Sequence, residues 1–360
     1  MELIINTCWG VDLRMLGYQK AAMDAVREYA KTKSEEHRAF AQKVCEPLSV
    51  DIDILVAKLL RSPVTINFHP DRLSNNGQTV IDNLLEQGLY HGQFHTGTTN
   101  GGKSAYIGGD RFNWEQRLFF GAYPKDALAR PKYGALNIFS YIDGASARFG
   151  SCYFSLKSDI VKRCTFAYGD SSTNPTKLCT CDTFASILTG LLEDVQLNRR
   201  LLDHVVETEQ EALAMLLNQG NRINNIGRNL DYCIEAHVHG DISLENDVEI
   251  FYMDESFRDT PFEDKAELLC QKYGINFCRI PIRELNVADI GSLFRGAKIP
   301  ILAKKIDCVF SNNHGVINSY LIGRASRDSI INPDKWHDIG NEDEVFQYFK
   351  QLWHTIAFFG

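Results

Sequence analysis

The stretch that most constrains the fold is an alternating segment at residues 231–241. Side chains of a strand alternate between its two faces, so one face carries Ile234, Ala236 and Val238. The other face carries Glu235, His237 and His239. A carboxylate and two imidazoles in one row can titrate, hydrogen-bond to sugar hydroxyls or bind a metal ion. We therefore expect a half-buried strand whose polar face points away from the core and borders a cleft.

Two other stretches end in polar, turn-forming residues in the way that strands beside clefts do. Phe68-His-Pro-Asp-Arg72 follows an alternating segment over 64–68, and the arginine is a candidate clamp for an anion because its guanidinium binds phosphate bidentately. Gln93-Phe-His-Thr-Gly-Thr-Thr-Asn-Gly-Gly102 follows an expected strand over 90–95. Its glycines allow the backbone to approach a ligand closely.

The remaining periodicities indicate an α+β protein, because antiparallel strands cluster and helices stand apart from them. Further strands are expected over 133–142, 149–156, 163–168, 248–253 and 277–282 and near Ile301 and Ile317, with a hairpin turn at Asp143-Gly144. Helices are expected over 16–46, 51–60, 80–85, 112–120, 183–198, 201–217, 266–273, 288–294 and 342–358. We divide the chain into an N-terminal helical region (1–62), a core (63–255) and a C-terminal α/β extension (256–360).

The composition of the 360 residues limits the classes of molecule that the protein is expected to bind. A net charge of −8 argues against nucleic-acid and membrane-surface partners, which favour a basic face. No apolar run approaches the roughly twenty residues of a membrane span. The first residues lack a basic segment followed by an apolar one, so we expect no signal peptide and a cytoplasmic location.

Six motifs together resemble one largely bacterial family of proteins of unknown function, and through it the ADP-ribosyltransferase superfamily. They cover most of the chain from about residue 50 onward. The motifs are Phe68-His-Pro-Asp-Arg72, Gln93-Phe-x-Thr-Gly-x-x-Asn-Gly-Gly102, Arg130-Pro-Lys-Tyr-Gly-Ala-Leu-Asn137, Phe149-Gly-Ser-Cys-Tyr-Phe154, Glu235-Ala-x-Val-His-Gly240 and Gln351-Leu-Trp-His354.

The resemblance implies a split antiparallel β-sandwich with NAD, the substrate, in the cleft of the 63–255 core. Glu235 would bond the ribose hydroxyl and stabilise the cation that forms as nicotinamide leaves, with His237 beside it as a second catalytic candidate. Arg72 would hold the phosphates. Thr96, Thr98 or Ser151 would support the nicotinamide ribose. The residues expected to contact NAD are His69, Arg72, Gln93, Thr96, Thr98, Asn100, Gly101, Gly102, Tyr133 and Ser151.

The same resemblance implies a protein acceptor for ADP-ribose, without a metal ion, and is compatible with delivery into a host cell without a cleavable signal. One departure concerns the acceptor residue. Arginine-modifying enzymes carry Glu-x-Glu with the catalytic carboxylate second, whereas Cys233 stands at the first position here. The acceptor class therefore stays open.

Three other functions compete with the transferase. His237-Val-His239 with Asp241, completed by His69 and Asp71, could be the ligand set of a metal-dependent hydrolase. Gly97-Thr-Thr-Asn-Gly-Gly102-Lys103-Ser104 matches a phosphate-binding loop, but that loop requires a helix immediately afterwards, and Gly108-Gly109 leaves no room for one. A non-catalytic binding module would use Glu235 and Arg72 as a buried structural pair.

Overall fold

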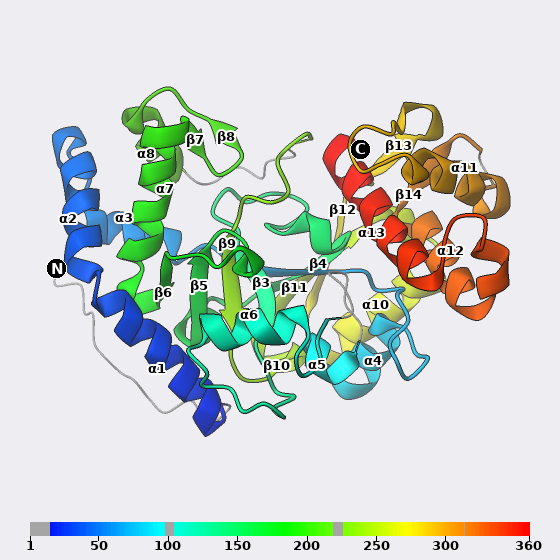
Figure 1. The fold of residues 1–360 in the computed structure, drawn as a ribbon, viewed down its shortest axis with the longest axis horizontal. Helices are drawn as coiled ribbons and strands as arrows, with labels where there is room; N and C mark the ends of the chain where they lie inside the picture. Colours follow the sequence, from blue (N-terminus) through cyan, green and yellow to red (C-terminus); the bar gives the residue numbers. More distant parts are fainter. Residues whose placement is uncertain (1–14, 98–103, 219–225, 313) are drawn as a thin grey trace.

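An eight-stranded mixed sheet forms the centre of the computed structural model, which describes residues 15–97, 104–218, 226–312 and 314–360 (Figure 1). The strand order is β12-β11-β4-β1-β3-β9-β5-β6, and neighbouring strands are antiparallel except β11 and β12. The strands are β1 (Val64–Phe68), β3 (Lys132–Leu136), β4 (Cys152–Leu156), β5 (Cys164–Tyr168), β6 (Leu178–Thr180), β9 (Ile234–Val238), β11 (Val248–Asp254) and β12 (Asn276–Ile280).

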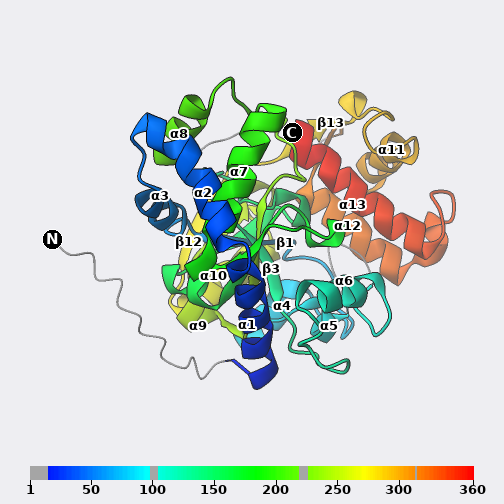
Figure 2. The ribbon, with the colours of Figure 1, turned by 60° about the vertical axis from the view of Figure 1, so that its left-hand side comes forward.

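The helices surround this sheet, with α1 and α2 at one end of the molecule and α11 to α13 at the other (Figures 1 and 2). They are α1 (Gly17–Lys31), α2 (Ser34–Cys45), α3 (Ile52–Leu59), α4 (Val80–Gln87), α5 (Gln93–Thr96), α6 (Asp110–Leu118), α7 (Ala185–Asn198), α8 (Glu209–Leu217), α9 (Leu244–Asp247), α10 (Pro261–Tyr273), α11 (Lys298–Phe310), α12 (Ser319–Ile331) and α13 (Glu342–Phe359). None of the helices in the described part of the chain has the length and apolarity needed to cross a membrane.

The α+β prediction is confirmed, but the strands do not form two separate sheets. β1 pairs with β3 along one edge and with β4 along the other, so hydrogen bonding runs without a gap across the sheet. The described residues add only two-stranded pairs: β2 (Leu89–Tyr90) with β10 (Ile242–Ser243), β7 (Arg200–Leu201) with β8 (His204–Val205), and β13 (Glu284–Asn286) with β14 (Val316–Asn318).

The two faces of the sheet are covered differently. Ile234, Ala236 and Val238 lie in the main hydrophobic core together with side chains of α3, α7, α8 and α10. The opposite face of β9 is also buried, because Phe119 and Tyr123, at and after the end of α6, pack over its histidines. A second core joins α11, α12 and α13, and it lies in the C-terminal part of the chain.

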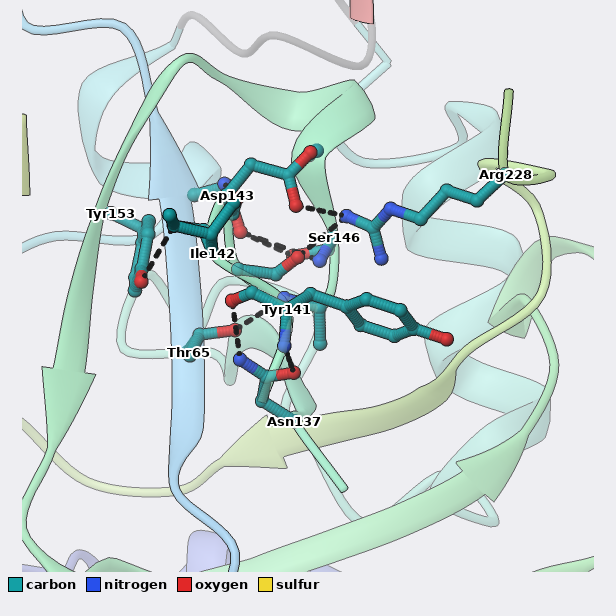
Figure 3. A network of polar contacts seen from close by, with 12 residues as sticks. Thr65, Asn137, Tyr141, Ile142, Asp143, Ser146, Tyr153 and Arg228 are labelled. Carbon is teal, nitrogen blue, oxygen red and sulfur yellow. Dashed lines mark hydrogen bonds and ion pairs between the residues drawn. The ribbon is translucent and has the colours of Figure 1, made fainter. Parts of the chain in front are cut away.

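Asp143-Gly144 does not form the expected hairpin, because β1 lies between β3 and β4. The segment between them is instead held by polar contacts from other elements (Figure 3). Asn67 on β1 donates to the Asp143 carbonyl at 2.8 Å, and Arg228 donates to the Asp143 carboxylate at 2.8 Å. Arg283 reaches the other carboxylate oxygen at 3.2 Å. Asp143 therefore ties the C-terminal part of the chain to the centre of the sheet.

Four local predictions are wrong. Residues 93–96 form one helical turn, closed by the Gly97 amide on the Gln93 carbonyl at 2.9 Å, with Gly97 at φ +67°. The helix expected from 201 begins at Glu209, where Thr208 caps it, and a β7–β8 hairpin precedes it. Val287–Asp289 is only a 3-10 turn, with no helix over 288–294. Ile301 lies in α11, whose buried residues recur at helical spacing.

Candidate functional site

A cavity of about 530 Å³ opens on the polar face of the sheet, a size that suits a nucleotide-sized ligand. Its floor comes from β1, β3 and β9, and its far wall comes from α12 and α13. The cavity brings together six of the predicted site residues: His69, Arg72, Gln93, Thr96, Tyr133 and Glu235. Segments more than 150 residues apart in sequence thus meet in one concavity.

Glu235 lines the cavity, and one of its carboxylate oxygens is already hydrogen-bonded within the protein. Its Oε2 accepts the backbone amide of Ser171 at 2.8 Å and also contacts the Ser171 hydroxyl. His237 Nε2 lies 3.2 Å from the same oxygen. The residues opposite Glu235 on the neighbouring strands are Ala135 and Ala167, which are too small to cover it. The side chain is therefore fixed in orientation, and although Glu235 is only 7% exposed, no described residue is bonded to its other oxygen, Oε1.

His237 and His239 do not face the cavity, contrary to the expected half-buried strand, because both are fully buried. Thr165 Oγ1 lies 3.0 Å from His237 Nδ1 and 3.0 Å from His239 Nε2. Tyr123 OH lies 2.7 Å from His239 Nδ1. Burial lowers the pKa of His239 well below its usual value, with His237 as the next cause, so the ring is neutral.

These contacts link Tyr123, His239, Thr165 and His237 into one continuous row. At its end, His237 Nε2 lies 2.9 Å from the Ser171 hydroxyl and 3.2 Å from Glu235 Oε2. His237 therefore contacts Glu235 from behind and does not line the cavity itself.

Ser151 lies behind the cavity wall. Its hydroxyl accepts a hydrogen bond from Ser319 at 2.6 Å and sits 3.4 Å from His69 Nδ1. It therefore supports His69 and does not belong to the cavity lining. Thr98, Asn100, Gly101 and Gly102 lie outside the described residues.

Arg72 contacts its surroundings only lightly. Its Nη1 donates to the Ile322 carbonyl of α12 at 3.4 Å. The adjacent Asp71 carboxylate accepts from Arg327 at 2.8 Å. Burial lowers the pKa of Arg72, with the Asp71 charge opposing that shift. Within the described residues, no carboxylate pairs with Arg72 at salt-bridge distance.

Four cationic side chains line the cavity but were not predicted as site residues from the sequence: Arg111, Lys132, Arg148 and Lys350. With Arg72 they face two lining carboxylates in the described part of the chain, Glu235 and Glu342. Burial lowers the pKa of Lys350, with Arg148 and Arg295 adding to the effect. The cavity is thus cationic in a chain of net charge −8. Their signal was proximity to the quoted motifs, since Lys132 lies inside one and Arg148 and Lys350 directly precede two others.

Carboxylates hold two of these arginines in place. Arg148 pairs with Asp170 and Asp231, and Asp170 directly precedes the Ser171 that binds Glu235. Arg111 stacks over the Tyr133 ring at 4.5 Å, with Glu115 3.8 Å away. The Tyr133 hydroxyl donates at 3.1 Å to Glu115 Oε1, the carboxylate oxygen that faces Arg111. The cations and Glu235 are therefore parts of one connected polar framework.

The rival ligand sets are not assembled. Within residues 15–97, 104–218, 226–312 and 314–360, no three His, Cys, Asp or Glu side chains gather as a metal site would require. His69 contacts the Trp353 ring, whereas His237 and His239 are bound to Thr165. The phosphate-loop match has no helix directly after Ser104, because α6 begins at Asp110.

His354, one turn after Lys350 on α13, gives a pH test of this framework. Burial, then Arg295, Lys350 and Arg148, lower its pKa to about 3. The unfolded chain, at a pKa near 6.5, therefore takes up the proton first, and stability falls as the pH drops below about 6.5. We expect His354→Leu to remove this contribution, which grows by about 1.4 kcal/mol per pH unit. Urea unfolding at pH 7.5, 6 and 5 measures the difference.

The exposed His314 supplies the control for that measurement. His314→Leu shows how much of any change comes from replacing a surface histidine by leucine. Parallel stability curves for wild type and His354→Leu would show that His354 does not stay neutral in the folded protein.

Among curated proteins, none matches this chain. A family model described as protein of unknown function, DUF3626, matches residues 63–359, which include every described residue of the cavity. The chain therefore belongs to the DUF3626 family.

Proposed function

We propose that this protein is an NAD-dependent mono-ADP-ribosyltransferase that modifies a protein side chain and releases nicotinamide. One observation carries the proposal: a carboxylate with one oxygen immobilised and one available stands in a cationic, nucleotide-sized cavity. The motif resemblance to the ADP-ribosyltransferase superfamily adds to it. The proposal does not rest on the sheet topology.

The reaction requires stabilisation of positive charge at one carbon. The glycosidic bond between nicotinamide and C1′ of the ribose breaks, and its electron pair leaves with neutral nicotinamide. The acceptor nucleophile then bonds to C1′ and gives up its proton. Glu235 Oε1 would accept a hydrogen bond from a ribose hydroxyl and offset the developing oxocarbenium charge. Ser171 and His237 keep the carboxylate oriented during that step.

The cations would hold the pyrophosphate. Arg72 supplies a guanidinium that can bind two phosphate oxygens at once, whereas Lys350 supplies a point charge. Arg111, Arg148 and Lys350 all line the cavity, and Arg148 is held near Glu235 through Asp170, which directly precedes Ser171. Like charges packed together favour an anionic ligand, because the ligand relieves their repulsion.

The direct test is incubation of the purified protein with NAD, with nicotinamide release measured by chromatography and protein labelling measured with tagged NAD and a cell lysate. A cytoplasmic enzyme, or one delivered into a host cell, would find its acceptor among the lysate proteins. We expect both signals, and we expect them to persist in EDTA. Absence of both would refute the transferase. Activity that EDTA abolishes and zinc or manganese restores would favour the metal-dependent hydrolase.

A further inference from the structure

The cavity continues beyond the cations into a region lined by the C-terminal helices. We call this region the aromatic lobe; its residues are Leu73, Val80, Ile330, Trp336, Phe346 and Phe349. Leu73, Val80 and Phe346 are half-buried, and Ile330 is 58% exposed. Trp336 and Phe349, each only 2% exposed, contact each other edge to face, with ring centroids 5.3 Å apart, and belong to the second core behind the lobe. Leu73, Val80, Ile330 and Phe346 thus supply the apolar surface that other described residues do not cover fully.

Two of the cations adjoin this lobe, because Arg72 directly precedes Leu73 and Lys350 shares α13 with Phe346. Lys350 and Phe346 are one turn apart on α13, about 6 Å along the helix axis. A third cation joins α13 to the Glu235 end: Trp353 of α13 donates to the Ala147 carbonyl at 2.9 Å, and the next residue, Arg148, pairs with Asp170, the neighbour of the serine that binds Glu235. Arg72 contacts α12 through Ile322, and α12 also supplies Ile330. The cavity therefore runs from a fixed carboxylate, past positive charge, to an aromatic end.

We propose that the aromatic lobe binds the adenine ring of the nucleotide substrate. This inference rests on the proposed function and adds the part of the cavity that selects the base. A purine is planar and apolar on its faces, so half-buried aliphatic and aromatic walls bury it favourably. Asn83, Ser326 and Ser329 also line the cavity and can bond the polar edge of the ring.

The lobe suits the base better than it suits the acceptor protein. An acceptor nucleophile must reach C1′ beside Glu235, whereas the lobe adjoins Arg72 and Lys350, the cations proposed to hold the pyrophosphate. Along NAD, the pyrophosphate separates the nicotinamide ribose from the adenine base. Along the cavity, the carboxylate, the cations and the aromatic lobe would meet these three groups in the same order. The C-terminal helices would therefore confer specificity for adenine nucleotides.

Calorimetry with two half-ligands tests the assignment. AMP contains the adenine but no nicotinamide, and nicotinamide mononucleotide contains the nicotinamide but no adenine. We expect Phe346→Ala to weaken AMP binding roughly tenfold or more, as loss of an aromatic stacking partner does, and to leave nicotinamide mononucleotide binding unchanged. Phe359→Ala is the matched control, since Phe359 ends the same helix, is 47% exposed and lies outside the cavity. It should bind both ligands as the wild type does.

The outcomes separate this inference from the proposed function. Loss of AMP binding in Phe346→Ala alone supports the adenine site, even if the wild type fails to cleave NAD and the transferase proposal falls. Equal AMP affinity in wild type and Phe346→Ala overturns the site, as does a wild type that binds no AMP. Parallel loss of both half-ligands also overturns it, because the lobe would then not distinguish the base.

Discussion

Glu235→Gln is expected to slow nicotinamide release from NAD by about a hundredfold or more, with NAD affinity nearly unchanged. Glutamine keeps the shape of the side chain, and its amide oxygen can still accept from Ser171, which now holds Oε2. Its amide nitrogen would then occupy the position of Oε1. That group bears no negative charge and cannot accept a hydrogen bond from the ribose hydroxyl. The stabilisation of the transition state is therefore lost, while the rest of the cavity still binds NAD. Single-turnover nicotinamide release and calorimetry with NAD measure the two effects.

Glu249→Gln is the matched control for this variant, because Glu249 is an exposed residue on β11 of the same sheet. It should retain wild-type rates. Nicotinamide release in Glu235→Gln within a few-fold of wild type would remove Glu235 from the catalytic role. Melting temperatures close to wild type are required of both variants, so that a slow rate is not read from unfolded protein.

Arg72→Lys should raise the dissociation constant for NAD by roughly tenfold to a hundredfold, with a smaller effect on the rate of the bound substrate. A hydrogen bond to a charged group contributes about 1.5–3 kcal/mol, and every 1.4 kcal/mol is a factor of ten. Lysine preserves the charge but not the planar fork that binds two phosphate oxygens. Because Arg72 donates only one long hydrogen bond within the described residues, to the Ile322 carbonyl, the substitution should leave the fold intact.

The control for the clamp is Arg61→Lys, since Arg61 is exposed and precedes β1 outside the cavity. Calorimetry that gives equal NAD affinity for Arg72→Lys, Arg61→Lys and wild type would exclude the clamp. A fall in the rate with unchanged affinity would instead assign Arg72 to the reacting end of the cavity.

The sequence by itself determined the strand that carries Glu235 and the class of fold. Alternation is a local property of an extended backbone, so the apolar row of β9 had to enter the core and Glu235 had to face the other side. The final helix was equally clear, because its apolar residues recur over eighteen residues and Asn341 caps its start. Short segments such as Gln93–Thr96 were misjudged, since a four-residue turn has no periodicity to read.

Only the tertiary structure decided what each polar residue does. Glu235, His237 and His239 look equivalent along the strand, yet α6 and the residues after it cover the two histidines, while small residues at 135 and 167 leave Glu235 open. Lys350 lies more than a hundred residues after Glu235, and its position directly before the 351–354 motif does not show that it lines the same cavity as Glu235. The electrostatic potential at a site is the sum of contributions from all charges near it in space. These charges come together only after the chain has folded and its distant segments have met.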